Sequence, residues 1–279
     1  MRALTTLVLS TVLLAGTLAA AQALDFQNAA KKLCQDTVTA LQATDAKPLT
    51  QTLSAQASSF LASDGEILVR TSRKKLADQE KWAEEPLLSD EAELKDFKAV
   101  DYMYAGEVTA KIVDGDKQYD LRGLCVYEAN GFRWLMLALV PPQPEDKQKL
   151  ADLRHEITQL GESWVGTLTQ GDIARMLGTM APDAFTLAMV GPDYGFYVFS
   201  DPAEVQAMLE GGDVNGAITI EMQSGPDGLF TPQLAAVEYK WNFGIADFQS
   251  VPLKVWVHLY HDKDAGWRVA AICGLPPQQ

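Results

Sequence analysis

Apolar residues recur every three to four positions between Lys147 and Leu168, the period of a helix with one buried face. A shorter helix is predicted over Asp172–Met180. A third begins at Asp201, where Asp-Pro-Ala-Glu combines a capping residue, a first-turn proline and a capping-box glutamate. Apolar and alternating runs predict the strands Ala184–Val190, Phe196–Phe199, Ala217–Gln223, Leu234–Phe243, Leu253–Tyr260 and Gly266–Gly274. The second half therefore reads as two helices, two strands, one helix and four strands.

The first half follows a similar order. Its pattern predicts helices over Phe26–Leu41, Pro48–Leu61 and Arg73–Trp82. Strands are predicted over Glu66–Thr71, Leu94–Tyr104, Glu107–Val113, Gln118–Glu128 and Phe132–Val140, with hairpin turns at Asp114-Gly115-Asp116 and Asn130-Gly131. The run Pro141-Pro142-Gln143-Pro144 is a natural linker, because proline stiffens the backbone.

Two stretches at the ends of these halves are nearly the same. Gly131–Gln143 reads GFRWLMLALVPPQ, and Gly266–Gln278 reads GWRVAAICGLPPQ. Gly, Arg, Pro, Pro and Gln coincide, and an aromatic residue is second in both. One copy closes the chain and the other lies near the middle, which indicates a duplicated domain.

The element order and the terminal Gly-aromatic-Arg strand resemble the nuclear-transport-factor-2-like superfamily, also called SnoaL-like or cystatin-like. The resemblance covers both halves. It implies an α+β fold of two similar domains, 24–143 and 144–279, each a curved antiparallel sheet wrapped around about three helices in a cone with a pocket at its mouth. Members include isomerases, dehydratases and hydrolases as well as non-catalytic binding or assembly domains, so the fold alone does not choose a function.

The first 23 residues have the pattern of a secretory signal peptide. Arg2 supplies the positive start, Leu4–Ala20 is mainly apolar, and Ala21-Gln22-Ala23 is a small-x-small cleavage site. We therefore expect a periplasmic or secreted protein with no membrane anchor after cleavage. The formal net charge of −14 repels nucleic-acid backbones and argues against nucleic acid as a partner.

Three cysteines are present, and none belongs to a Cys-x-x-Cys motif. Because Cys34 and Cys125 both fall in the first half and an oxidising compartment permits disulfides, this pair is the preferred bridge. The alternative is that all three, including Cys273, are buried thiols.

The three histidines give no metal site. His155 lies on a predicted helix off its apolar stripe, and His258 and His261 point to opposite faces of one strand. No carboxylate pattern completes a ligand set, and no cofactor motif occurs, so neither metal nor cofactor is expected.

One aromatic arrangement could form a binding site. Trp256, His258 and Tyr260 share one strand face, and Tyr239, Trp241 and Phe243 share a face of the preceding strand. If the two sets face each other, they make an aromatic wall with one titratable group. Aromatic strand faces that simply pack give the same pattern.

We expect an exported, non-catalytic protein that binds a small apolar ligand or a periplasmic partner protein in a second-half pocket. The alternatives are an isomerase-, dehydratase- or hydrolase-like enzyme with His258 as acid or base, and a structural or assembly domain. The duplication also predicts a monomer whose halves pair internally, sheet against sheet.

Overall fold

The computed structural model describes residues 25–55, 59–66, 68–102, 105–129, 131–181, 186–190, 196–199, 201–211, 218–245 and 250–276. The predicted signal peptide, Met1–Ala23, lies outside these residues. Within them, no helix combines the length and hydrophobicity needed to span a bilayer.

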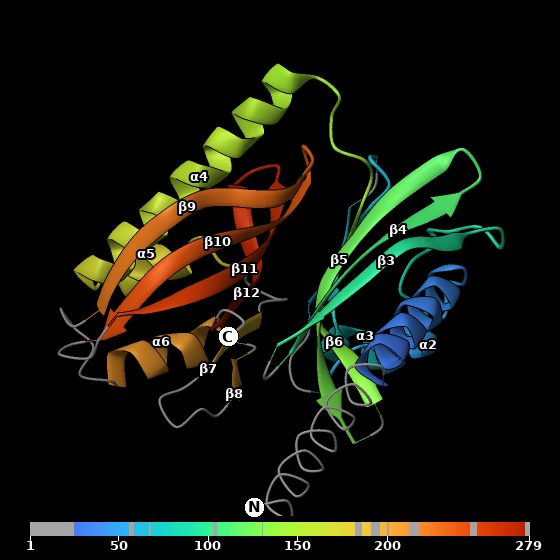
Figure 1. Cartoon of the computed structure of the whole chain (residues 1–279), viewed down its shortest axis with the longest axis horizontal. Helices are drawn as coiled ribbons and strands as arrows, with labels where there is room; N and C mark the ends of the chain where they lie inside the picture. Colours follow the sequence, from blue (N-terminus) through green and yellow to red (C-terminus); the bar gives the residue numbers. More distant parts are fainter. Residues whose placement is uncertain are drawn as a thin grey trace, which may run out of the picture.

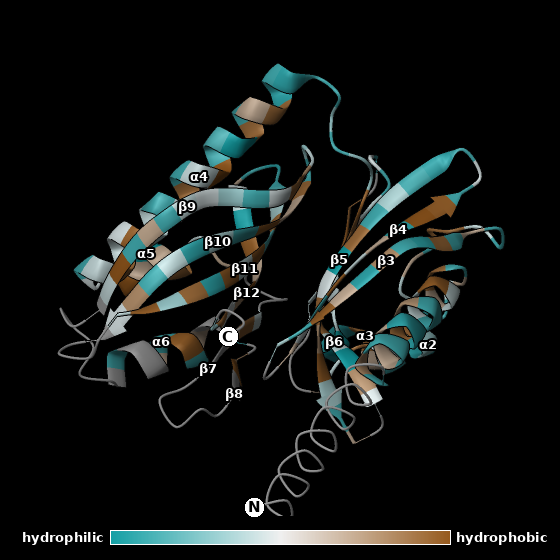
Figure 2. Ribbon diagram, in the orientation of Figure 1, coloured by the Kyte–Doolittle hydropathy of each residue, from teal (hydrophilic) through white to brown (hydrophobic). Residues whose placement is uncertain are grey.

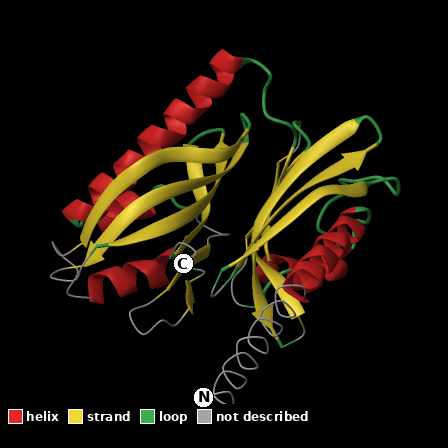
Figure 3. Ribbon diagram, viewed as in Figure 1, coloured by secondary structure: helices red, strands yellow, loops and turns green. Residues whose placement is uncertain are grey.

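The first half contains three helical segments and one sheet (Figures 1 and 3). Residues 25–41 are helical and are followed by α2 (Ala46–Thr52) and, after two strands, by α3 (Arg73–Ala77). The strands are β1 (Ser59–Ser63), β2 (Leu68–Ser72), β3 (Glu93–Asp101), β4 (Gly106–Asp114), β5 (Lys117–Glu128) and β6 (Gly131–Val140).

The second half repeats this order. Helices α4 (Lys147–Gln170) and α5 (Ile173–Leu177) come first, and α6 (Pro202–Gly211) follows two strands. The strands are β7 (Thr186–Val190), β8 (Phe196–Phe199), β9 (Ile218–Phe230), β10 (Leu234–Ile245), β11 (Val251–Asp262) and β12 (Gly266–Leu275).

The two sheets have the same topology. Their strand orders are β2-β1-β6-β5-β4-β3 and β8-β7-β12-β11-β10-β9. In each, one early strand pairs in parallel with the last strand, β1 with β6 and β7 with β12, while the other pairs are antiparallel. The expected α+β class with two similar domains is confirmed.

The sequence repeat is also a structural repeat. Leu53 forms an isolated bridge with Trp134, and Met180 forms one with Val269, the residue that the repeat aligns with Trp134. Both repeats begin with a glycine at positive φ, Gly131 at 103° and Gly266 at 71°, as a tight hairpin requires.

Each sheet has its own core on the side that faces its helices. The first core joins helix 25–41 and α2 to inward residues such as Ile112 and Leu121. The second joins Ile157 and Trp164 of α4 to Tyr239 and other inward residues of the second sheet. Figure 2 shows apolar residues alternating with polar ones along α4, as expected of a helix with one buried face.

The structure differs most from the predicted elements at three places. The predicted helix Pro48–Leu61 is instead α2 followed by β1, which is buried along its length and pairs with both neighbours. Helix α3 ends at Ala77 rather than at Trp82, and β9 runs on to Phe230. Sheet pairing outweighs local preference in β1 and β9. After α3 the backbone instead pairs with the segment before α2, through hydrogen bonds from Ala46 N to Glu80 O and from Trp82 N to Thr44 O (both 2.9 Å).

The outer faces of the two sheets, away from the helices, pack against each other. One cluster joins Ala105, Leu124, Val126, Leu135 and Met136 to Ala188, Trp256, Ala271, Cys273 and Leu275. Another joins Leu61, Ala138 and Val140 to Ala181, Leu234, Ala236, Tyr260 and Ala270. In Figure 1 the helices accordingly lie on the far sides of the two sheets.

This packing has approximate two-fold symmetry. Three pairs of repeat-equivalent residues are divided between the two clusters: Leu135 and Ala270, Ala138 and Cys273, Val140 and Leu275. A rotation that exchanges the two halves therefore exchanges these parts of the clusters, while Met136 and its equivalent Ala271 both lie in the first cluster. The polar contacts Ser63 Oγ to Gln233 Oε1 (2.6 Å) and Arg70 Nη1 to Tyr260 Oη (2.8 Å) also cross the interface.

Candidate functional site

The two predicted aromatic sets lie on opposite faces of the second sheet, so the single aromatic wall does not form. In antiparallel strands, directly paired residues share a face. Tyr239 pairs with Val255, whereas Trp256 pairs with Glu238. Tyr239 and Trp241 lie in the second core beneath the helices, whereas Trp256 and Tyr260 lie between the two sheets.

The inward-facing aromatic residues Tyr239 and Trp241 pack beneath the helices of the second half. Tyr239 is fully buried and its hydroxyl donates to the Ile157 carbonyl at 2.9 Å. A Cβ on Gly161 would lie 2.8 Å from the Tyr239 ring, so helix and strand are in close contact there. Trp241 is buried, and Phe243 is half-buried.

His258 lies in the interface between the sheets and is 2% exposed. Burial, and secondly the nearby Arg122 charge, lower its pKa to about 3. Its Nδ1 has no hydrogen-bond partner among the described residues. A neutral, enclosed imidazole is poorly suited to exchange protons with a bound substrate.

Four charged side chains form a closed ring in the interface, called here the charge ring. Arg122 Nη2 lies 2.9 Å from Glu107 Oε1 and 2.6 Å from Glu238 Oε2. Lys254 Nζ lies 2.9 Å from Glu107 Oε2 and 2.8 Å from Glu238 Oε2. Glu107 and Arg122 come from the first sheet and Glu238 and Lys254 from the second, so opposite charges alternate around the ring.

The ring favours the charged forms of Glu107 and Lys254. Burial acts to raise the pKa of Glu107, but Arg122 and Lys254 outweigh it and the pKa is lowered. Burial acts to lower the pKa of Lys254, but hydrogen bonds to Glu238 and Glu107 outweigh it and the pKa is raised. Each buried charge is thus compensated by two of opposite sign.

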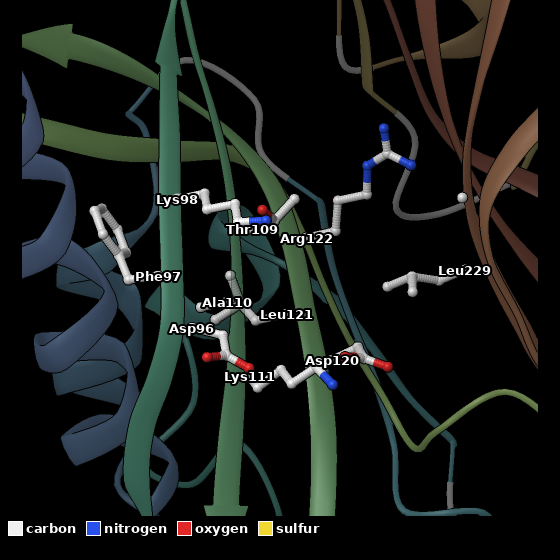
Figure 4. A pocket seen from close by; sticks show the side chains of 11 residues that line it. Asp96, Phe97, Lys98, Thr109, Ala110, Lys111, Asp120, Leu121, Arg122 and Leu229 are labelled. Carbon is white, nitrogen blue, oxygen red and sulfur yellow. The ribbon is translucent and has the colours of Figure 1, made fainter.

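A groove of about 720 Å³ opens beside the ring, between the outer face of the first sheet and the end of β9 (Figure 4). We call it the junction groove. Its lining comprises Asp96, Phe97, Lys98, Thr109, Ala110, Lys111, Asp120, Leu121, Arg122, Gly228 and Leu229.

Strand register brings the polar lining together. Lys98 pairs with Thr109, and Thr109 pairs with Arg122, so the three stand in one row across β3, β4 and β5. Lys111 pairs with Asp120 in the next row, and Figure 4 shows both on the same side of the sheet. Burial raises the pKa of Asp120, and the charge of Lys111 opposes this.

The far wall of the groove depends on a glycine. Gly228 has φ 138°, and a Cβ there would lie 2.4 Å from both the Ala236 carbonyl oxygen and Arg122 Nη1. Arg122 Nη1 in turn donates to the carbonyls of Ala236 (3.3 Å) and Asp227 (3.4 Å). The end of β9 therefore approaches the first sheet as closely as a backbone without a side chain allows.

The sequence did not single out the groove residues. Lysine, threonine and aspartate on strand faces are ordinary, and only the register together with the back-to-back packing brings them together. Arg122 could have been noticed as a cation within the run Leu121–Val126, where most neighbours are apolar.

The three cysteines are free thiols, all buried. The predicted Cys34–Cys125 bridge is therefore not formed in this structure, although both residues belong to the first core. Burial raises the pKa of all three thiols, that of Cys125 to about 12. Among the described residues, no group of three or more His, Cys, Asp or Glu side chains is arranged to hold a metal ion.

Comparison with known proteins gives likenesses to parts of the chain. No family model matches it. The transcriptional regulator ArgP of Pectobacterium carotovorum, of the helix-turn-helix type, is 32% identical over 117 residues, which cover 38% of this chain and 39% of that protein. The chain thus spans about two fifths of the length of the curated relatives it matches.

Solved structures of NTF2-like proteins each align with about half of the chain. A superfamily member from Salmonella enterica serovar Typhimurium is 13% identical, with 47% of this chain and 94% of that chain covered and a TM-score of 0.40. A protein of unknown function from Pseudomonas putida is 18% identical, with 46% and 89% covered and a TM-score of 0.40. At these identities the likeness concerns the fold and not the function.

Proposed function

We propose that this chain is an exported, non-catalytic binding protein that holds a small ligand in the junction groove. The observation that carries the proposal is the groove itself. Its volume of about 720 Å³ falls within the range of small-molecule sites, roughly 300–1,000 Å³. Leu229 contributes apolar surface to one wall beside charged groups of both signs, while Leu121 borders the groove from β5 with its side chain buried in the first core. This combination suits a ligand with an apolar part and a charged group.

The proposal moves the binding site away from the second-half pocket expected from the sequence. Tyr239 and Trp241 are occupied in packing against α4 and its neighbours. The groove, by contrast, has Lys98 exposed on its rim and in no ion pair among the described residues.

Catalysis through His258 has little support, because its imidazole is enclosed between the sheets and stays neutral above a pKa of about 3. Export rests on the Met1–Ala23 pattern. The mass of the protein purified from the periplasm of an expressing bacterium tests it, since cleavage after Ala23 removes that segment.

The binding proposal is tested with 8-anilinonaphthalene-1-sulfonate, a probe with an apolar body and one charge. We expect saturable binding near one probe per chain. Thr109→Trp places an indole in the middle of the groove and should weaken the affinity at least about tenfold. Lys117→Trp, at an exposed position of the same sheet outside the groove lining, should leave it unchanged. Equal affinity in all three proteins, or no binding at all, would contradict the proposal and favour an assembly role.

A further inference from the structure

The charge ring joins two surfaces that descend from the same repeat yet carry different charges. Ala138 pairs with Arg122, and its repeat equivalent Cys273 pairs with Trp256. Arg122 and Trp256 thus hold equivalent places. Thr109 pairs with Arg122, and Glu238 pairs with Trp256, so Thr109 and Glu238 are also equivalent.

The equivalence extends to the neighbouring rows. Lys98, which pairs with Thr109, corresponds to Asp227, which pairs with Glu238. Asp120 pairs with Val140 and Lys254 pairs with Leu275, so these two also correspond. The two halves therefore carry different charges at these equivalent positions: Lys98 corresponds to Asp227, and Asp120 corresponds to Lys254.

We propose that this difference makes the interface selective: the outer face of a first half fits the outer face of a second half and rejects a copy of itself. Because the packing has approximate two-fold symmetry, a like pairing can be examined by placing each residue of one half at the position of its equivalent in the other half. If two first halves met in the same way, Asp120 would stand where Lys254 stands, next to Glu107. Arg122 would face Thr109 in place of Glu238.

Pairing of two second halves would also lose the ring. Trp256 would replace Arg122 next to Glu238, and Ala236, the equivalent of Glu107, would stand next to Lys254. Only the mixed pairing gives each buried charge two partners of opposite sign. Two first halves would bury Asp120 next to Glu107, a like-charge contact that is strongly unfavourable. Two second halves would keep only the Lys254–Glu238 pair and lose the other three contacts of the ring, so the mixed pairing is favoured over both.

The outer face of a first half is therefore covered by a second half, and the reverse. Because the linker Pro141–Pro144 is short, the two halves that pair belong to the same chain. The ring thus keeps the molecule a monomer although both apolar faces suit a dimer. The inference does not depend on ligand binding in the junction groove.

Two charge-reversed chains test the inference. One chain carries Arg122→Glu with Glu107→Arg, and the other carries Glu238→Arg with Lys254→Glu. Each pair of changes places like charges next to each other across the interface of its own chain, and each should lower the melting temperature by roughly 10 °C. Unfolded together and refolded, the two chains should form a heterodimer of about twice the monomer mass. In it, the reversed first half meets the reversed second half and opposite charges alternate around the ring again, while the two unchanged halves meet as in the natural protein. Native mass spectrometry identifies the heterodimer.

Two further proteins make the result decisive. The variant with all four changes in one chain, in which every ring contact again joins opposite charges, should return to a monomer and recover most of the lost melting temperature. Lys32→Glu reverses one member of an exposed pair, Lys32–Asp36, and should change neither mass nor melting. A charge-reversed chain that keeps the natural melting temperature, or a mixture without heterodimer, would overturn the inference.

Discussion

Replacing His258 should remove a defined part of the acid sensitivity of this protein. The imidazole is enclosed between the sheets beside Arg122, and its Nδ1 has no hydrogen-bond partner among the described residues. Strand pairing makes Leu124 its equivalent in the first sheet, since Leu124 pairs with Met136 as His258 pairs with Ala271. His258→Leu therefore introduces a side chain that the same position already holds in the other half.

The size of the effect follows from the two pKa values. His258 has a pKa of about 3 in the folded protein, against the ordinary 6.5 expected in the unfolded chain. Below pH 6.5 the unfolded chain takes up a proton that the folded protein does not. Stability from this group is thus fully present above pH 6.5 and is lost as the pH falls towards 3. Between pH 7 and pH 5 the loss is about 2 kcal/mol of unfolding free energy.

The assay is urea unfolding of both proteins at pH 7 and pH 5. Carboxylates titrate in both, so their contribution cancels in the difference between natural protein and variant. The natural protein should lose about 2 kcal/mol more than His258→Leu over this interval. His155→Gln, at an exposed position on α4, should behave like the natural protein. An equal loss in the natural protein and His258→Leu would refute the burial and neutrality of this imidazole.

Two further predictions concern the interface glycine and the thiols. Gly228→Ala should destabilise the protein by about 2 kcal/mol in the same urea assay, because a Cβ there meets the Ala236 carbonyl oxygen and the Arg122 guanidinium. Gly115→Ala, also at positive φ but in open space, should destabilise it less. The thiols of Cys34, Cys125 and Cys273 should resist a thiol reagent in the native protein, because they are buried and burial raises their pKa values. After unfolding without reductant all three should react, whereas one reactive thiol instead of three would mean that a disulfide forms.

Most of the fold follows from local patterns in the sequence. The long amphipathic helix α4 and the hairpin strands were predicted to within a few residues, because burial on one face repeats along each of them. Strand β1 was not, since Ser59–Ser63 is short and its burial arises from pairing with β2 and with the distant β6. The corresponding strand of the second half, β7, was predicted, so aligning the two halves could have revealed β1.

The site was less accessible to sequence reasoning than the fold. Alternation showed that Trp256, His258 and Tyr260 share a face, but not that this face is opposite to the one with Tyr239 and Trp241. The register between β10 and β11 decides it. The charge ring brings together residues from four strands of two sheets, a relation that no local pattern contains.

Amide chemical-shift mapping by NMR locates ligand binding residue by residue. The isotope-labelled protein is titrated with 8-anilinonaphthalene-1-sulfonate, and the shifted amides are assigned. The largest shifts should lie along Lys98, Thr109 and Lys111 and at Leu229, on the walls of the junction groove. Shifts confined to the surroundings of Tyr239 and Trp241, beneath the helices of the second half, would contradict binding in this groove.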